Sequence, residues 1–407
     1  MIHIKGGRPA DVLVDGAKIR KVGKITERAD ETVDARGLVV VPGLIDMHVH
    51  FREPGREDKE TIATGARAAL AGGFTSVAVM ANSGRVCDDA VGVVYVKTRS
   101  REAGLANVFP VGAVTKGLRG EELAEIGSMC EAGAVAFSDD GNPIMNAELM
   151  RRALEYARMF GKPILSHCED ATLTKGFVMN EGPVAARLGL RGYPNAAEAA
   201  MAARDCYLAA LTGGHVHLCH VSAQETVEVV RQAKKQGIAV TAEAAPHHLM
   251  LVDEALSGYE SKYKMNPPLR TRSDVEAVVR GVADGTIDAI ASDHAPHTAE
   301  EKEQELAACP NGVVGLETML GVVLSIGKIP FERAIDAMTA APARILGLAG
   351  KGVLEAGADA DLTLIDPKAP WTVDPARFQS KGRCTPFAGM TLTGRAVHVM
   401  VGGRMCS

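Results

Sequence analysis

The sequence has few of the features that mark several functional classes. Aromatic residues make up 4% of its 407 residues, with a single Trp, which disfavours platforms for stacking nucleic-acid bases or sugars. No run approaches the roughly 18 apolar residues needed to cross a bilayer. The formal net charge of −5 gives no electrostatic reason to expect nucleic acid or an anionic membrane as a partner. The charged fraction of 23% and the hydrophobic fraction of 46% are those of a soluble globular protein.

Cysteine pairs and a targeting segment are also missing. The eight cysteines are scattered without a CxxC pair, and in a chain of this length they are expected to be reduced, mostly buried thiols. Charged residues interrupt the first 16 positions, so we expect no signal peptide there. Both observations predict a cytoplasmic protein.

The middle of the chain alternates short apolar strands with helical segments. Eight strand–helix units favour a (β/α)8 barrel of the TIM type, although an open doubly wound α/β sheet fits the same pattern. The predicted strands cover residues 45–50, 75–81, 107–114, 134–139, 163–168, 215–221, 239–245 and 287–293. Predicted helices include residues 59–71, 121–132, 147–160, 196–211 and 223–235.

Both ends of the chain have a different, β-rich composition. Short β-branched runs separated by Gly-rich turns occur in the first 41 residues and return at 361–366 and 396–401. We therefore expect residues 1–44 and 350–407 to form one discontinuous β-domain. The barrel would then occupy residues 45–349.

Ionisable residues gather where the predicted strands end, which is where barrel enzymes carry their chemistry. His48 and His50 are two positions apart, so both side chains point to one face and could bind a divalent metal such as Zn²⁺. The HxH pair alone is weak evidence, because both rings could simply bind loop backbone. Together with His167, His220 and Asp293 at three other strand ends, it favours a metal centre.

Three histidines compete on the sixth strand. Alternation gives it two faces, one with His215, His217 and Cys219 and the other with Val216, Leu218 and His220. The apolar face suits the barrel interior, so we predict that His220 is the ligand and that the other face meets the helices. Cys168 and Cys219 are then expected to be core thiols that point away from the metal.

Motifs along nearly the whole chain resemble those of dihydroorotases in the amidohydrolase superfamily, most closely the bacterial class I enzymes. The matching stretches are residues 42–55 (PGLIDMHVHFREPG), 114–117 (VTKG), 136–141 (AFSDDG), 167–170 (HCED), 219–222 (CHVS), 266–270 (NPPLR), 293–297 (DHAPH), 315–318 (GLET) and 380–387 (SKGRCTPF). The resemblance implies a barrel with a small β-sandwich formed by both termini.

The same resemblance implies a set of metal ligands. His48, His50 and Asp293 would bind one zinc, His167 and His220 would bind a second, and a carboxylate after the fourth strand would bridge them. Many relatives use a carboxylated Lys as the bridge, but the fourth strand here ends in two aspartates with no Lys nearby. We assign the bridge to Asp140, with Asp139 as the alternative, and leave open whether one or two Zn²⁺ ions are bound.

The implied reaction is the reversible hydrolysis of the cyclic amide of L-dihydroorotate to N-carbamoyl-L-aspartate, a step of de novo pyrimidine biosynthesis. Water activated at the metals would attack the ring carbonyl, with Asp293 as general base and then general acid. Arg52, Asn82 and His297 would contact the substrate carboxylate, and Asn266 the ring amide. A surface salt bridge is the alternative role for Arg52.

The family also implies a homodimer and permits association with aspartate carbamoyltransferase. Other cyclic amidases, such as hydantoinase, dihydropyrimidinase or allantoinase, are the nearest alternative, but they usually have a bridging Lys and lack the Arg and Asn for a carboxylate. A non-catalytic barrel that serves as an assembly partner is a further alternative, but it typically loses metal-site histidines.

Two departures from the family pattern lie outside the proposed metal ligands. A proline is missing beside Asn82, and Cys384 replaces the usual Asn of the terminal motif. The polar segment 298–312 is predicted to be a mobile flap, although an ordinary surface loop has the same composition.

Overall fold

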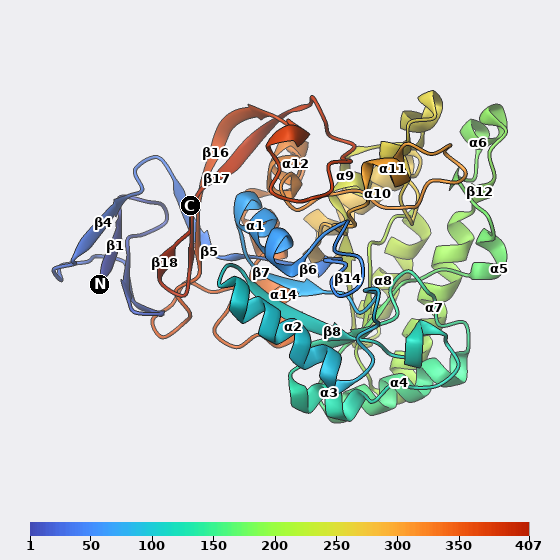
Figure 1. Ribbon diagram of the computed structural model, residues 1–407, viewed down its shortest axis with the longest axis horizontal. Coiled ribbons are helices and arrows are strands. Elements are labelled where there is room, and N and C mark those ends of the chain that lie inside the picture. Colours follow the sequence, from blue (N-terminus) through green and yellow to red (C-terminus); the bar gives the residue numbers. More distant parts are fainter. Residues whose placement is uncertain (407) are drawn as a thin grey trace.

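Eight parallel strands form the central sheet of the protein in a computed structural model that describes residues 1–406 (Figure 1). Their order in the sheet is β15-β14-β13-β10-β9-β8-β7-β6. The ends of the sheet approach each other where Val49 pairs with His294 in a parallel bridge and the His50 N–H donates to the His294 carbonyl at 2.8 Å. The result is a nearly closed barrel, which confirms the predicted α/β class and excludes the open sheet. The strands are β6 (Leu44–Val49), β7 (Phe74–Val79), β8 (Asn107–Gly112), β9 (Ala136–Ser138), β10 (Ile164–Ser166), β13 (Val216–Leu218), β14 (Val240–Ala244) and β15 (Ala289–Ile290).

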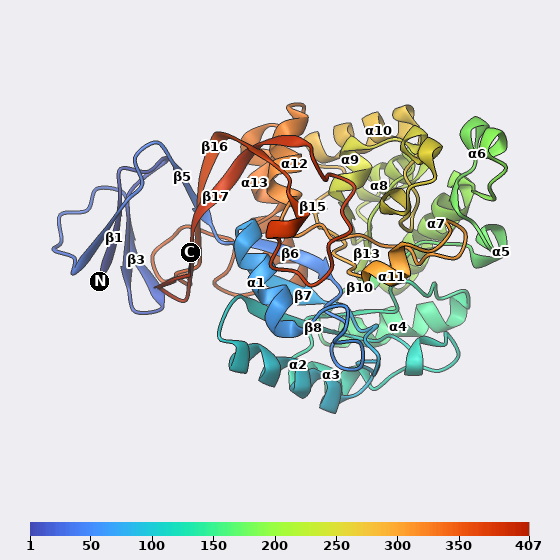
Figure 2. The same ribbon diagram turned by 45° about the horizontal axis from the view of Figure 1, so that its top comes forward.

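Helices follow the strands and surround the barrel (Figure 2). In α4 the Asn146 side chain accepts from the N–H groups of Glu148 and Leu149, which caps the helix, and its buried residues recur at helical spacing along one face. No helix within residues 1–406 is long and apolar enough to cross a membrane. The larger helices are α1 (Ile62–Gly72), α2 (Ala90–Ala103), α3 (Ile126–Ala132), α4 (Ala147–Met159), α7 (Asn195–Thr212), α8 (Gln224–Lys235), α10 (Arg272–Ala283), α12 (Met319–Ile326), α13 (Phe331–Ala337) and α14 (Ala340–Leu346).

Shorter elements lie in the loops around the barrel mouth and between the larger helices. They are α5 (Ala171–Thr174), α6 (Pro183–Leu188), α9 (Pro246–Met250), α11 (Ala299–Lys302), the two-stranded sheet of β11 (Met179–Asn180) and β12 (Gly192–Tyr193), and the 3-10 turns η1 (Lys116–Leu118), η2 (Asp253–Gly258), η3 (Ser261–Tyr263) and η4 (Pro375–Arg377).

Strand β13 faces the opposite way from our prediction. Val216 and Leu218 pack in the core cluster that the surrounding helices share, whereas Cys219 packs inside the barrel with Leu165. His217 lies on the interior face, where its Nε2 is 3.2 Å from Glu243 Oε2. The apolar face therefore meets the helices, because helices cover the outside of a parallel sheet and demand an apolar surface there.

The terminal segments build two four-stranded sheets beside the barrel, next to the N- and C-termini in Figure 1. The two sheets have the orders β3-β2-β1-β4 and β18-β17-β16-β5. In the second sheet β5 pairs with β16, which joins residues from both ends of the chain, and a shared core contains Ile4, Val14, Leu364 and Met400. The strands are β1 (Ile2–Lys5), β2 (Val12–Asp15), β3 (Lys18–Val22), β4 (Glu31–Asp34), β5 (Val39–Pro42), β16 (Leu362–Thr372), β17 (Thr391–Val401) and β18 (Arg404–Met405).

Candidate metal centre and active site

Backbone turns at the strand ends aim three of the predicted site residues into the barrel mouth. Five non-glycine residues of the described chain have positive φ, and among them are Arg52 (φ 61°), His220 (φ 34°) and Asp293 (φ 46°). Such backbone is uncommon outside glycine and occurs where surrounding structure holds it in place. For His220 it has a direct consequence: β13 ends at Leu218, and the left-handed residue turns the imidazole towards the mouth despite its place in the strand alternation.

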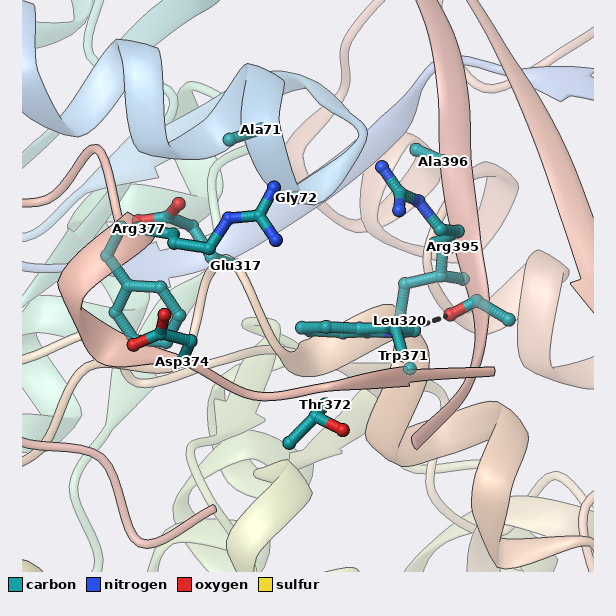
Figure 3. Close-up of a pocket in the computed structure, with 13 residues that line it drawn as sticks. Ala71, Gly72, Glu317, Leu320, Trp371, Thr372, Asp374, Arg377, Arg395 and Ala396 are labelled. Atoms are coloured by element: carbon teal, nitrogen blue, oxygen red, sulfur yellow. Dashed lines mark hydrogen bonds between the residues drawn. The ribbon is translucent and has the colours of Figure 1, made fainter. Parts of the chain in front are cut away.

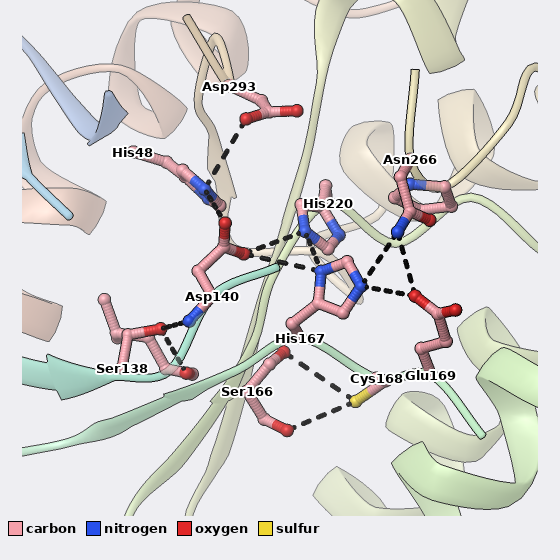
Figure 4. Close-up of polar contacts among 12 residues, drawn as sticks. His48, Ser138, Asp140, Ser166, His167, Cys168, Glu169, His220, Asn266 and Asp293 are labelled. Carbon is pink, nitrogen blue, oxygen red and sulfur yellow. Dashed lines mark hydrogen bonds and ion pairs between the residues drawn. The ribbon is translucent and has the colours of Figure 1, made fainter. Parts of the chain in front are cut away.

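The Asp140 carboxylate lies between two pairs of histidines (Figure 4). Its Oδ2 is 3.4 Å from Nε2 of both His48 and His50. Its Oδ1 is 3.2 Å from His220 Nε2 and 3.5 Å from His167 Nδ1. One carboxylate oxygen thus faces each pair, which is the arrangement that a bridging ligand needs.

Asp293 and Asp139 have different surroundings. Asp293 Oδ1 lies 3.1 Å from His50 Nε2 and 3.6 Å from His48 Nε2, so Asp293 joins the first pair. Asp139 instead accepts from the backbone N–H groups of Val114, at 2.8 Å, and Thr115, at 3.0 Å. Asp139 therefore fastens the loop that follows β8 and does not face the histidines.

The donor set fits a metal. Ligand atoms lie within 4.8 Å of one another in three groups: His48, His50 and Asp293; Asp140, His167 and His220; and His48, Asp140 and Cys219. His48 Nε2 is buried and has no hydrogen-bond partner within the described chain, which leaves its lone pair or proton facing the site. Imidazole and carboxylate groups in this combination suit Zn²⁺. Cys219 corrects our prediction, because its thiol points towards the site and not away from it.

Charges inside the mouth shift the pKa values of these groups strongly. Burial disfavours ionisation of Asp140, yet the surrounding imidazoles of His48, His167 and His220 hold its pKa well below the usual range. Burial likewise disfavours a charged His167, but Asp140 and Glu169 raise its pKa to about 10. The protons and a metal ion compete for the same ring nitrogens, because only a neutral imidazole can coordinate.

Residues that the sequence analysis missed hold the other ring nitrogens. Glu243 of β14 lies 2.6 Å from His48 Nδ1, and Glu169 lies 2.8 Å from His167 Nε2. Asn82, which the sequence analysis had assigned to the substrate, also has its Oδ1 2.7 Å from His50 Nδ1. Such outer contacts orient ligating imidazoles. An acidic residue within the apolar strand that we predicted at 239–245 was the available signal for Glu243.

A cavity of about 210 Å³ opens beside this cluster. All of the predicted substrate contacts line it: Arg52, Asn82, Asn266 and His297. Burial lowers the pKa of Arg52 to about 10, which leaves the guanidinium charged at neutral pH, and its Nε donates to the Pro296 carbonyl at 3.2 Å. The cavity suits a small polar ring, since drug-sized ligands need roughly 300–1,000 Å³.

His297 and Asn266 are already hydrogen-bonded. Burial and the neighbouring charges of Arg52 and Lys59 lower the pKa of His297 to about 4, so the ring is neutral and its Nε2 lies 2.8 Å from the Asn311 carbonyl. Lys59, which sequence reasoning missed, lies 3.2 Å from His297 Nδ1. Asn266 Nδ2 donates to Glu169 at 2.8 Å.

Two buried lysines fasten the segment 298–312 beside the cavity. Lys302 donates to the carbonyls of Pro310, at 2.9 Å, and Gly312, at 3.0 Å. Lys264 donates to the carbonyls of Leu306, at 2.6 Å, and Cys309, at 2.7 Å. The motion of this segment as a flap stays a prediction. If the segment opens, the hydrogen bonds of Lys264 have to break or Lys264 has to move with it.

The chain is similar to proteins of one family over its full length. The family described as "Dihydro-orotase-like" matches residues 37–226. A protein named dihydroorotase from Pelotomaculum thermopropionicum is 53% identical, with 99% of this chain and 97% of that protein covered. One of the same name from Anaeromyxobacter dehalogenans is 51% identical, with 100% and 97% covered.

Solved structures show the same fold. The L-hydantoinase (dihydropyrimidinase) from Arthrobacter aurescens has a TM-score of 0.90 at 26% identity, covering 99% of this chain and 95% of that one. The dihydropyrimidinase from Brevibacillus agri has a TM-score of 0.84 at 23% identity, covering 99% and 93%. The relatives named dihydroorotase share about half of their residues with this chain over its full length, and a His/Asp cluster lies at the barrel mouth. The chain therefore belongs to the dihydroorotase family and is a hydrolase of the amidohydrolase type.

Proposed function

We propose that the protein is a zinc-dependent dihydroorotase of the bacterial class I type, which reversibly hydrolyses L-dihydroorotate to N-carbamoyl-L-aspartate. The observation that carries the proposal is the Asp140 carboxylate between the two histidine pairs, in the place where many other cyclic amidases use a modified lysine. His48, His50 and Asp293 would hold one Zn²⁺, and His167 with His220 a second, with Asp140 shared. When bound, the ions activate water and polarise the ring carbonyl.

Asp293 is the proton carrier in this proposal. Its carboxylate lines the cavity and is held by His50, so one oxygen faces the space where water and the ring carbonyl would meet. Burial opposes its ionisation, but His50 and His48 hold its pKa below the usual range, which keeps it ready to accept a proton. It then returns that proton to the departing ring nitrogen.

Four residues would bind the substrate. Among the described residues that line the cavity, Arg52 is the one Lys or Arg that can form a charge-assisted pair with a carboxylate, supported by Asn82 and His297. Asn266 would contact the ring amide. Because His297 already bonds the Asn311 carbonyl, we expect that contact to exchange when the carboxylate arrives.

A hydantoinase or dihydropyrimidinase activity is the second candidate, favoured by the two solved structures of similar fold. Their ring substrates carry no carboxylate, whereas dihydroorotate does. The decisive experiment is zinc reconstitution, metal analysis and assay with dihydroorotate, hydantoin and dihydrouracil. Preference for dihydroorotate supports the proposal, and preference for the neutral rings, or no activity with bound zinc, contradicts it.

Arg52→Ala, measured in the same assay, tests whether Arg52 binds the substrate carboxylate. We expect KM for dihydroorotate to rise by roughly 10- to 100-fold, because a charge-assisted contact is lost. Arg101→Ala, on the exposed face of α2, is the matched control and should change nothing. An unaltered KM in Arg52→Ala would show that Arg52 does not bind the substrate carboxylate.

We also propose that residues 1–44 and 350–407 form one discontinuous β-sandwich domain and residues 45–349 the barrel domain. Pairing of β5 with β16 supports this division. From the family we propose a cytoplasmic homodimer that can associate with aspartate carbamoyltransferase. Light scattering of the purified protein, alone and mixed with that enzyme, tests both assemblies.

A further inference from the structure

A second and larger cavity lies away from the barrel mouth, between the end of α1, helix α12 and the β16–β17 hairpin (Figure 3). Its volume is about 560 Å³. The side chains of Trp371, Arg377 and Arg395 line it, together with the carboxylates of Glu317 and Asp374. None of these residues belongs to the site described above.

Two guanidinium groups in this cavity have no partner. Within residues 1–406, neither the Arg377 nor the Arg395 side chain forms a hydrogen bond or an ion pair. Figure 3 shows both groups directed into the cavity from opposite sides. Two unpaired guanidinium groups that point into one cavity can both form charge-assisted hydrogen bonds with an anion bound there.

The nearby carboxylates offset part of this charge. Asp374 is engaged in capping the short turn η4, where it accepts from the Ala376 N–H at 3.0 Å. Glu317 accepts from the backbone N–H groups of Gln379, at 2.9 Å, and Ser380, at 3.1 Å. Burial raises the pKa of Glu317 to about 7, so its negative charge is incomplete at neutral pH. Of the charged side chains that line the cavity, two arginines therefore face one ionised carboxylate and one that is partly protonated near neutral pH.

The only Trp of the chain forms one wall and is fixed in place. Its Nε1 donates to the Gly394 carbonyl at 3.0 Å. Its ring packs on α12 at Gly321, where an added Cβ would lie 3.0 Å from the indole Cζ2. Figure 3 shows the indole edge-on below both guanidinium groups, so one ring face borders the space into which they point.

We propose that this cavity is a binding site for a nucleoside monophosphate, with the phosphate held between Arg377 and Arg395 and the base stacked on Trp371. Paired guanidiniums match the geometry and charge of a phosphate. A fixed aromatic face accepts any base by stacking. The volume lies within the range of small-molecule sites.

A buried hydrogen-bond chain joins this cavity to the active site. Glu317 binds the Ser380 backbone, the Ser380 hydroxyl donates to Glu60, and Glu60 Oε2 lies 3.3 Å from His294 Nε2. His294 follows Asp293 directly and its carbonyl accepts from His50. An anion bound beside Glu317 acts on the first member of this chain, so we expect occupancy to alter turnover.

The single Trp supplies the assay. Its fluorescence is recorded while the zinc-loaded protein is titrated with uridine 5′-monophosphate, adenosine 5′-monophosphate, uridine or inorganic phosphate. We expect saturable quenching by the nucleotides with Kd below roughly 1 mM, and much weaker binding of uridine or phosphate alone. Arg377→Ala and Arg395→Ala should each weaken nucleotide binding by at least about tenfold. Arg280→Ala, an exposed arginine of α10, is the matched control.

Several outcomes would overturn the proposal. No saturable quenching, or quenching that persists unchanged in both arginine variants, rules out this site. Phosphate binding as tightly as the nucleotides rules out base stacking on Trp371. For the link to catalysis, nucleotide should change kcat or KM by at least about fivefold in the parent protein and not in Glu317→Gln. Tight binding with unchanged kinetics contradicts that link, and binding itself is measured whatever reaction the active site performs.

Discussion

The barrel mouth and the core of the terminal sheets are both buried, but opposite chemistry fills them. In the sheets, Ile4 and Leu364 are fully buried among other aliphatic side chains. At the mouth, His48 and Glu243 are just as inaccessible but ionisable: Glu243 contacts one ring nitrogen of His48, and the other faces Asp140. Buried charges cost free energy unless they are paired, whereas buried aliphatic groups gain it. The sheets therefore stabilise the fold, and the mouth holds charges in place for chemistry.

At the barrel mouth, Asp293→Asn is expected to have the largest effect on turnover. The amide can no longer carry the proton, so kcat should fall by about 10²- to 10⁴-fold. Zinc content, measured on the purified variant, should fall far less because most of the ligands remain. Equal losses of metal and turnover would show that Asp293 serves as a ligand alone.

Leu364→Ala tests the sheets. Removing a fully buried side chain should lower the free energy of unfolding by about 2–5 kcal/mol, measured by denaturant titration. Specific activity of the folded protein should stay unchanged. Leu211→Ala, at an exposed site of α7, is the matched control. A selective loss of activity without loss of stability would mean that the two regions are not separable in this way.

Glu243→Gln tests the barrel mouth, because it removes the negative charge beside His48 Nδ1 and keeps the size of the side chain. Zinc affinity should fall by roughly 10- to 100-fold, as for other outer contacts of metal ligands. Competition with a chelating dye measures it, and Glu228→Gln on the exposed face of α8 controls for the loss of one carboxylate. Unchanged affinity would show that the His217–Glu243–His48 contacts do not support the metal.

Glu317→Gln is expected to have the smallest effect, a pH-dependent change in the melting temperature. Burial raises the pKa of Glu317 from 4.5 to about 7 in the folded protein, so between those values the unfolded chain loses this proton first. Its contribution therefore favours the folded state at low pH and is lost as pH rises towards 7. The melting temperature of Glu317→Gln relative to the parent should increase across this interval and then level off. A difference independent of pH would refute the shifted pKa.

Much of the fold follows from local pattern. The eight predicted strands all occur, with ends shifted by at most three residues, because apolar runs bounded by turns are a property of neighbouring residues. The clustering of histidines at strand ends is predictable for the same reason, since parallel strands bring their carboxyl ends to one edge. His220 lies at the mouth beside Asp140 and His167, although the assignment of strand faces that led to it was incorrect, and its role as a metal ligand stays a prediction. A left-handed residue beyond the strand end, which alternation cannot show, turns it inward.

The sequence by itself determined the eight strand–helix units, the β-rich ends and the set of residues able to hold a metal, whereas closure of the sheet into a barrel was decided by the tertiary structure. Only the tertiary structure distinguished the surroundings of Asp139 and Asp140, which are adjacent and chemically identical but face a loop backbone and the histidines respectively. It alone revealed Glu243, 195 positions from His48, and the converging arginines beside Trp371. The packing of the whole chain sets the direction of a side chain at a strand end and the contacts between distant segments. Local periodicity in the sequence predicts neither.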